Sequence, residues 1–170
     1  MVSIISVNYN SSDETLDMVK SVRANTKVEY ELIIVDNASK DNEVNKLKIL
    51  ENDSDIKLIY SKKNVGFASG NMLGVEKANK DSKYYFFLNN DTLLINNVVD
   101  TLYKTLEQNS DIGLASPQLY DENEKRSTTF REFPSVSEKI FGKGFKRFVS
   151  LRKIYNNKKE YEDVIDVGIV

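Results

Sequence analysis

Short, largely apolar runs alternate with segments of helical periodicity over the first 119 residues, and this alternation restricts the fold more than any other feature. The runs are rich in β-branched and aromatic residues, which is typical of buried strands. The strands are expected at Val2–Asn8, Glu31–Asp36, Ile56–Tyr60, Tyr84–Leu88 and Ile112–Leu119. Buried strands that alternate with helices indicate a mainly parallel sheet with helices on both faces, so we expect an α/β fold.

Between these runs, apolar residues recur three or four positions apart, which is typical of helices with one buried face. The helices are expected over a segment that ends near Asn25 and over Lys40–Asn52, Phe67–Asn79 and Ile95–Gln108. Ser11 and Glu14 have the spacing of a capping box at the start of the first helix. After Leu119 the pattern changes to a turn at Asp121–Lys125, a strand at Arg126–Phe133, a helix at Ser135–Lys153 and a strand-like run at Val164–Val170.

The chain has 170 residues, enough for one domain with a substantial core, and it contains no cysteine and no histidine. These absences exclude disulfides, thiol nucleophiles, Cys/His zinc sites and the Ser-His-Asp triad. The net charge of −2 gives no reason to expect a nucleic-acid partner. The opening apolar run is too short for a signal anchor and lacks a basic region, so a cytoplasmic protein is the default expectation.

Polar loops follow the expected strands. In parallel sheets, ligands bind beyond the carboxyl ends of the strands. The loops at those ends are all rich in Asn, Asp and Ser: Asn8–Asp13, Asp36–Asp41, Ser61–Phe67 and Asn89–Leu93. This composition favours a polar ligand site at one edge of the sheet.

Asp36 closes the second strand, where a carboxylate can accept hydrogen bonds from a nucleobase or ribose. The dinucleotide-binding fold has an acidic residue at this point, but it also needs a glycine-rich first turn. The turn at 8–12 contains no glycine, which excludes NAD binding. The alternative is that Asp36 or Ser39 caps the next helix.

Gly66 and Gly70 lie between the third strand and its helix. They permit close approach of the backbone to a ligand, and the helix N-terminus beyond them can favour an anion. Glycines four residues apart also suit tight helix packing, so that alternative stays open. The segment lacks Gly-Lys-Ser/Thr and is therefore not a P-loop.

An acidic turn, Asn89-Asn90-Asp91-Thr92, follows the fourth strand. Mg²⁺ takes one or two protein carboxylates and completes its shell with water and substrate phosphates. Asp91 can therefore hold a divalent cation if a diphosphate supplies other ligands. The alternative is an Asx turn that starts the following helix.

The stretch 139–159 interleaves aromatic and aliphatic residues with Lys and Arg, and its charged residues are all basic. A solvated helix with a core-facing stripe is the favoured interpretation. The stretch can also lie on an anionic membrane surface, as a peripheral contact at the inner face of the membrane.

Together these segments resemble the family 2 glycosyltransferases of the GT-A fold, in particular their rhamnosyltransferase-like branch. The resemblance rests on ordered motifs that cover nearly the whole chain. They are Val2–Asn10, Glu31–Ser39, Asn64–Ala68 with Asn71, Leu88–Thr92, Ile112–Leu119 and Arg131–Pro134.

The resemblance implies a Rossmann-like GT-A sheet that binds a dTDP- or UDP-sugar with Mg²⁺ or Mn²⁺. Asp91 is the implied metal ligand, and Asp36 the implied ligand of the base. The other implied nucleotide-binding residues are Asn8, Tyr9, Asn10, Asn64, Gly66, Asn71 and Asn90. The implied reaction is inverting transfer of the sugar to a polysaccharide or lipid-linked acceptor.

Two departures from the family pattern matter. Asn89 stands where the family's metal motif has its leading Asp, although the rhamnosyltransferase-like branch often has Asn there. The family's later half, which carries the expected catalytic base, is expected beyond Val170, so the catalytic residue is not assigned. We thus expect a nucleotide-sugar-binding subdomain at 1–119 and the start of an incomplete acceptor-side region at 120–170.

Two other functions are alternatives to a sugar-transferring domain. One is a non-catalytic nucleotide-binding or interaction module with a degenerate metal site. The other is a nucleotidyltransferase, which usually has a glycine-rich loop with Arg or Lys after its first strand. The loop Asn8–Asp13 has none of these residues, which disfavours that class.

Overall fold

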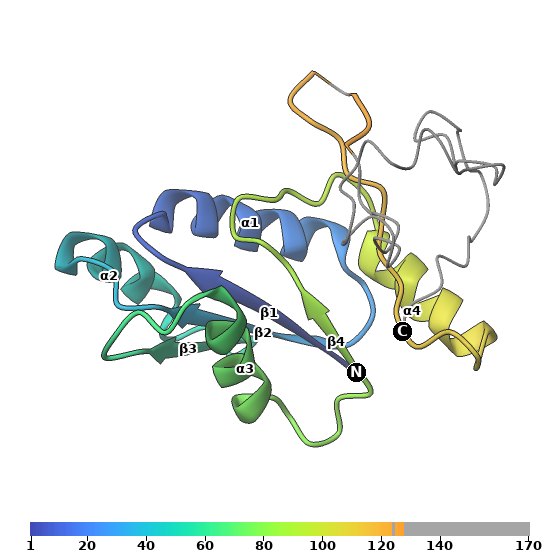
Figure 1. The fold of residues 1–170 in the computed structure, drawn as a ribbon, viewed down its shortest axis with the longest axis horizontal. Helices are drawn as coiled ribbons and strands as arrows, with labels where there is room; N and C mark the ends of the chain where they lie inside the picture. Colours follow the sequence, from blue (N-terminus) through green and yellow to red (C-terminus); the bar gives the residue numbers. More distant parts are fainter. Residues whose placement is uncertain (124, 128–170) are drawn as a thin grey trace, which may run out of the picture. The chain divides into compact units, whose positions relative to one another are not determined.

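Four parallel strands form the sheet in a computed structural model that describes residues 1–123 and 125–127 (Figure 1). They are β1 (Val2–Asn8), β2 (Tyr30–Asp36), β3 (Ile56–Tyr60) and β4 (Tyr84–Phe87), in the order β3-β2-β1-β4. Asn8 pairs with Asp36, and Asp36 pairs with Tyr60. The register therefore aligns the carboxyl ends of β1, β2 and β3 at one edge of the sheet.

Helices cover both faces of this sheet, as predicted for the α/β class. They are α1 (Ser12–Asn25), α2 (Asp41–Leu47), which continues as the short 3₁₀ helix η1 (Lys48–Leu50), α3 (Phe67–Lys77) and α4 (Val98–Gln108). Residues from α1, α2 and α4 join the core on one face, while α3 packs on the other. Residues Met1–Ala115 form one compact unit.

The alternation of side chains along β1 and β2 builds two apolar cores. Ile4 and Leu32 face α1, where they meet Met18. Their neighbours Ile5 and Ile33 point to the opposite face, beneath α3. Consecutive strand residues point to opposite faces. A strand covered on both sides is therefore buried along its whole length, as β1 is.

The predicted fifth strand at Ile112–Leu119 is wrong, because no ladder forms there. Pro117 lacks the amide hydrogen that a central strand needs. Leu114 is 66% exposed, so the apolar pattern of this segment does not correspond to a buried face. Leu114 and Ala115 instead line a cavity of about 290 Å³, together with side chains of β4 and α4. Within the described residues, β4 is consequently an edge strand.

Helix boundaries differ from the prediction in small ways. The helix expected from Ile95 begins at Val98, and the one expected over Lys40–Asn52 is α2 with η1. The capping box does not form: Ser11 is the N-cap of α1 but makes no side-chain capping bond. Its hydroxyl oxygen instead accepts a hydrogen bond from Asn90, as described below.

Residues 116–127 contain the predicted turn. Tyr120 and Arg126 form an isolated antiparallel bridge, and the carboxylate of Asp121 accepts hydrogen bonds from two backbone amides of the turn. Four other predictions lie wholly or largely outside the described residues: the strand at Arg126–Phe133, the helix at Ser135–Lys153, the basic stretch 139–159 and the strand-like run at Val164–Val170. No helix in the described part of the chain is long and apolar enough to cross a membrane.

Candidate functional site

The carboxylate of Asp36 lies at the centre of the carboxyl edge and is 2% exposed. Asn8 Nδ2 donates to its Oδ1 at 2.8 Å, and the backbone amide of Ser39 donates to its Oδ2 at 3.1 Å. The N-cap residue of α2 is Lys40, and this helix has no side-chain capping bond, so neither Asp36 nor Ser39 caps it. Because a carboxylate oxygen can accept more than one hydrogen bond, Asp36 retains acceptor capacity for a ligand.

Asn10 joins the first loop to the second. Its backbone amide donates to Ser39 Oγ at 2.8 Å, and its Oδ1 accepts from the backbone amide of Lys40 at 2.9 Å. Asn10 adopts a positive φ of 57°, a conformation that Asn tolerates better than most residues. Its side chain therefore shapes the site by holding the loop that follows β2.

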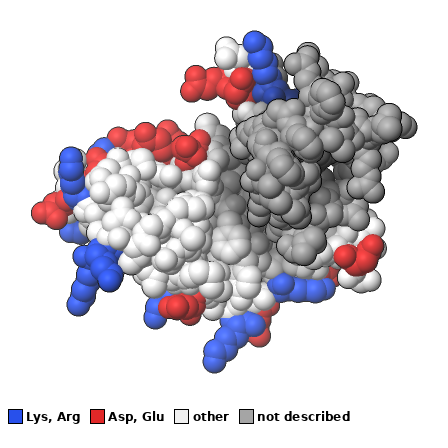
Figure 2. All heavy atoms as spheres, in the orientation of Figure 1, with Lys and Arg blue, Asp and Glu red and all other residues white. Residues whose placement is uncertain are grey.

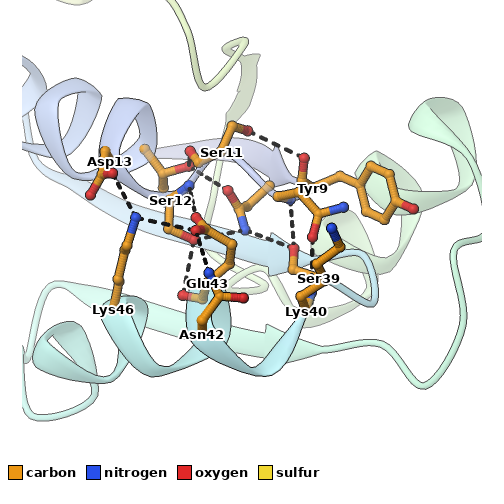
Figure 3. Close-up of polar contacts among 12 residues, drawn as sticks. Tyr9, Ser11, Ser12, Asp13, Ser39, Lys40, Asn42, Glu43 and Lys46 are labelled. Carbon is orange, nitrogen blue, oxygen red and sulfur yellow. Dashed lines mark hydrogen bonds and ion pairs between the residues drawn. The ribbon is translucent and has the colours of Figure 1, made fainter.

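A second group of contacts fixes the same two loops farther along (Figure 3). The backbone amide of Ser12 donates to Glu43 Oε2 at 3.0 Å, and Lys46 Nζ lies 2.6 Å from Asp13 Oδ2 and 3.1 Å from Glu43 Oε1. The Ser12 amide and then Lys46 hold the pKa of Glu43 below its usual value. Sequence reasoning missed Glu43, which resembles any acidic residue in a first helical turn.

The side chain of Tyr9 does not take part in the hydrogen-bonded cluster formed by the neighbouring loop residues. Its ring points away from the hydrogen-bonded cluster and is 51% exposed (Figure 3). It follows Asn8, which contacts Asp36 directly. An exposed aromatic ring in the loop that follows β1 offers a stacking surface to a ligand.

Tyr60 lies on the other side of Asp36, at the end of β3. Burial, a 2.9 Å hydrogen bond to Glu51 and the charges of Glu51 and Asp36 together raise the pKa of the Tyr60 hydroxyl to about 12. The hydroxyl therefore stays protonated at neutral pH and does not serve as a base there.

Asn37 organises the loop before α3. Its Nδ2 donates to Asn64 Oδ1 at 3.1 Å, and its Oδ1 accepts from the backbone amide of Val65 at 2.9 Å. Asn64 Oδ1 also accepts from the amide of Gly66 at 2.9 Å. The loop is thus held to the end of β2 through Asn37, a buried residue that sequence reasoning had not assigned.

Gly66 and Gly70 are required for different structural reasons. A Cβ atom at Gly66 would meet nothing within 4 Å, but its φ of 83° disfavours any other residue. A Cβ atom at Gly70 would lie 3.1 Å from both methyl groups of Val7, so this glycine serves helix packing. Asn71, which lies in α3, donates from Nδ2 to the carbonyl oxygen of Phe67 in its own helix. These contacts leave Gly66 as the glycine with an open approach to its backbone.

The turn after β4 joins α1 through Asn90. Its Nδ2 lies 2.7 Å from Ser11 Oγ and 3.0 Å from Thr15 Oγ1. Asp91, the next residue, is exposed, and no described residue forms a hydrogen bond or ion pair with its carboxylate. No cluster of three or more acidic, His or Cys side chains that could hold a metal occurs in the described part. Asp91 can thus offer one carboxylate to a cation, and one is enough for Mg²⁺ only where substrate phosphates and water supply the other ligands.

The comparisons with known proteins decide the family. A family model described as Glycosyl transferase family 2 matches residues 3–165. The chain belongs to glycosyl transferase family 2. An uncharacterized glycosyltransferase of Rickettsia bellii is 32% identical over 125 residues, and glycosyltransferase GlyG of Streptococcus pneumoniae is 23% identical over 127. The match covers 73% of this chain in both cases, but 18% and 41% of those proteins, so the chain spans a minor part of their length.

Solved structures show the same fold at low identity. TarS 1–349 of S. aureus, in complex with UDP-GlcNAc, superposes with a TM-score of 0.55 at 19% identity, over 69% of this chain and 37% of that chain. The mannosyltransferase PcManGT of Pyrobaculum calidifontis, in complex with GDP-Man and Mn²⁺, gives 0.53 at 19% identity, over 62% and 31%. These likenesses confirm the predicted GT-A-like α/β fold.

In this family 2 chain, the contacts bring most of the predicted site residues to one edge of the sheet. The backbone amide of Asn37 donates to the carbonyl of Asn8 at 2.8 Å, and that of Ser61 donates to the carbonyl of Asp36 at 2.8 Å. Asn71 is the exception, since the hydrogen bond of its side chain stays within α3. Around α3, Figure 2 shows mostly uncharged surface, while acidic side chains gather over the start of α1.

Proposed function

We propose that this chain is the donor-binding part of a glycosyltransferase and binds a nucleoside-diphosphate sugar, dTDP- or UDP-linked, at the carboxyl edge of its sheet. One observation carries the proposal. Asn8 contacts the Asp36 carboxylate, and Asn90 anchors the Asp91 turn to the start of α1, directly after the same strand. An acceptor for a base and a ligand for a cation thus flank the end of β1.

The proposed role of each residue follows from the hydrogen-bonding capacity or the exposed surface that its contacts within the protein do not use. Asp36 accepts a hydrogen bond from the base, and the exposed ring of Tyr9 stacks on it. The backbone at Gly66, ahead of the N-terminus of α3, lies along the diphosphate. Asp91 contributes one carboxylate to Mg²⁺ or Mn²⁺. When bound, such a cation neutralises charge on the leaving nucleoside diphosphate.

Relatives support this assignment of ligand class. The structure of TarS contains UDP-GlcNAc, and that of PcManGT contains GDP-Man with Mn²⁺. Both ligands are sugars activated by a nucleoside diphosphate. The choice of a rhamnosyl or other hexosyl group rests on the sequence motifs alone and is part of the proposal.

For the chemical step, we propose inverting transfer to a hydroxyl of a saccharide or lipid-linked acceptor. Such a transfer needs a general base to take the proton of that hydroxyl. We assign none of the described carboxylates to this role. Asp36 is buried and hydrogen-bonded, and Asp91 is assigned to the cation.

Calorimetric titration with UDP and with dTDP, each with and without Mn²⁺, tests the proposal. We expect Mn²⁺-dependent binding that Asp36→Ala and Asp91→Ala both weaken, and that Asp111→Ala, an exposed carboxylate after α4, leaves unchanged. Absence of binding at millimolar nucleotide would overturn the proposal. Metal-independent binding that Asp91→Ala does not affect would favour the non-catalytic module with a degenerate metal site.

A further inference from the structure

Four side chains form a continuous hydrogen-bonded chain from the end of β2 to the turn after β4. Asn8 Nδ2 donates to Asp36 Oδ1 at 2.8 Å. Thr15 Oγ1 donates to Asn8 Oδ1 at 2.9 Å. Asn90 Nδ2 donates to Thr15 Oγ1 at 3.0 Å. The chain thus joins the proposed base-binding carboxylate to the residue that precedes the proposed cation ligand.

The direction of every bond in this chain follows from Asp36. An ionised carboxylate only accepts hydrogen bonds, so Asn8 must turn its amide nitrogen toward it. The carbonyl oxygen of Asn8 then faces Thr15, whose hydroxyl has to donate. The single hydroxyl proton is used in that bond, and the oxygen of Thr15 is left to accept from Asn90.

Burial of Asn8 and Thr15 enforces these donor and acceptor directions. Asn8 and Thr15 are both 0% exposed, so water does not replace a lost partner at either one. The hydroxyl of Thr15 also lies 3.1 Å from the carbonyl oxygen of Ser11, one turn earlier in α1. That oxygen already accepts the backbone amide of Thr15, whereas Asn8 Oδ1 has no other described donor. The Thr15 hydroxyl therefore donates its proton to Asn8 Oδ1 and not to the carbonyl oxygen of Ser11.

Asn90, at the other end of this hydrogen-bonded chain, holds the turn after β4 in place. The amide nitrogen of Asn90 has Ser11 Oγ, Ser11 O and Thr15 Oγ1 as acceptors, all from the start of α1. The side chain of Asn90 is half-buried by these contacts, while that of Asp91 is exposed. Fixing Asn90 against α1 fixes the backbone from which Asp91 projects.

We propose that Thr15 is a positioning residue, which with Asn8 and Asn90 couples the Asp36 carboxylate to the turn that presents Asp91. The inference rests on the proposed function, because it takes Asp91 as the cation ligand. It also gives Asn90 a role that differs from direct contact with the nucleotide. Partners that orient a metal ligand typically account for about 10- to 100-fold in metal affinity.

The test compares Thr15→Val, which removes the hydroxyl, with Thr15→Ser, which keeps it. Thr105→Val is the matched control, because Thr105 Oγ1 donates to the carbonyl oxygen of Thr101 one turn earlier in α4, at 2.9 Å. The readout is the factor by which Mn²⁺ increases the affinity for UDP, measured by calorimetry on the full chain. We expect Thr15→Val to lower this factor about tenfold, with metal-free affinity unchanged. Thr15→Ser and Thr105→Val should retain it.

A Thr15→Val protein that keeps the full Mn²⁺ effect overturns the inference, as does one that loses metal-free affinity equally. If Thr15→Val does not fold, as judged by thermal melting, Asn90→Ala is expected to give the same selective loss. A wild-type chain without any Mn²⁺ effect contradicts the proposed cation site itself. The side-chain amide resonance of Asn90 then tests the coupling: it should shift in Thr15→Val and not in Thr15→Ser, and an unchanged resonance overturns the inference.

Discussion

Asn8 Nδ2 lies 2.8 Å from Asp36 Oδ1, and this bond joins the ends of the two central strands in a region closed to solvent. Asn8→Ala removes the donor to Asp36 and the acceptor for the Thr15 hydroxyl. Asp36 Oδ1 would then be buried without this donor, and the Thr15 hydroxyl would keep only the carbonyl oxygen of Ser11 as an acceptor, at 3.1 Å. We expect the free energy of unfolding to fall by about 3 kcal/mol, measured by urea denaturation.

Asn109→Ala is the control for this prediction. Asn109 follows α4 and is exposed, and its Nδ2 donates to the carbonyl oxygen of Thr105 at 2.8 Å. Loss of an exposed hydrogen bond should change stability by about 0.5 kcal/mol or less. Equal unfolding free energies for the two variants would show that Asn8 is not a structural centre of the site.

Replacing Gly66 or Gly74 by alanine should destabilise the fold, for a different reason at each position. Gly66 has φ 83° and ψ 167°, a region that is essentially restricted to glycine, and strain there costs about 1–3 kcal/mol. At Gly74, a Cβ atom would clash with Ile5 Cγ2. Overpacking of this kind also costs about 1–3 kcal/mol. Both variants should therefore show lower denaturation midpoints.

A second substitution at Ile5 separates the two causes. Ile5→Ala removes the atom that clashes, so its destabilisation should be less than additive with that of Gly74→Ala. With Gly66→Ala the two effects should add, since nothing lies within 4 Å of a Cβ atom there. Additivity in both double variants would contradict the packing role of Gly74.

Glu31 should make the stability of the fold depend on pH. Its side chain is 10% exposed, and burial opposes its charge. Hydrogen bonds from Lys57 Nζ at 2.7 Å, Ser3 Oγ at 2.6 Å and the backbone amide of Asn79 outweigh that cost, so the pKa of Glu31 lies below its ordinary value of 4.5. A carboxyl group whose pKa is lower in the folded state stabilises the fold above the unfolded pKa. That stability is lost as the pH falls from about 4.5 through the folded value.

Glu31→Gln is the variant that isolates this effect. It should lose about 1–3 kcal/mol at pH 7, because Lys57 and two buried donors lose their charged acceptor. Below pH 4.5 its unfolding free energy should fall less steeply than that of the wild type. Glu76→Gln, an exposed residue of α3, should follow the wild-type curve. Parallel curves for wild type and Glu31→Gln would exclude Glu31 as a source of acid lability.

Local pattern was sufficient to predict the first three strands. The predicted bounds of β1 and β3 agree with the structure, and β2 begins one residue earlier than expected. β1 and β2 are buried on both faces, so apolar residues occupy most of their positions, whereas β3 at the edge has a mixed burial pattern. The segment Ile112–Leu119 had a similar composition, but a strand also needs an edge to pair with, and that requirement is not visible in local sequence.

The sequence predicted where in the fold the candidate site lies, but not how its side chains are arranged. The polar loops at the strand ends identified the edge of the sheet. The partners of Asn10 and Asn90 lie about 30 and 75–79 residues away in the sequence, so the direction of their side chains depends on contacts that no local pattern contains. The sequence predicts only that Thr15 lies in a helical segment, and its hydrogen bond to Asn8 depends on the packing of α1 against β1.

Tyr9 provides the most direct test of the proposed base site. Its ring is 51% exposed and points away from the loop contacts, so the fold does not depend on it (Figure 3). Stacking of a base on an aromatic ring contributes about 1–3 kcal/mol, so Tyr9→Ala should weaken the binding of UDP or dTDP roughly 5- to 150-fold. The unfolding free energy should change by about 0.5 kcal/mol or less. Tyr9→Phe keeps the ring and should bind like the wild type, whereas a loss equal to that of Tyr9→Ala would mean that the hydroxyl, and not stacking, recognises the nucleotide.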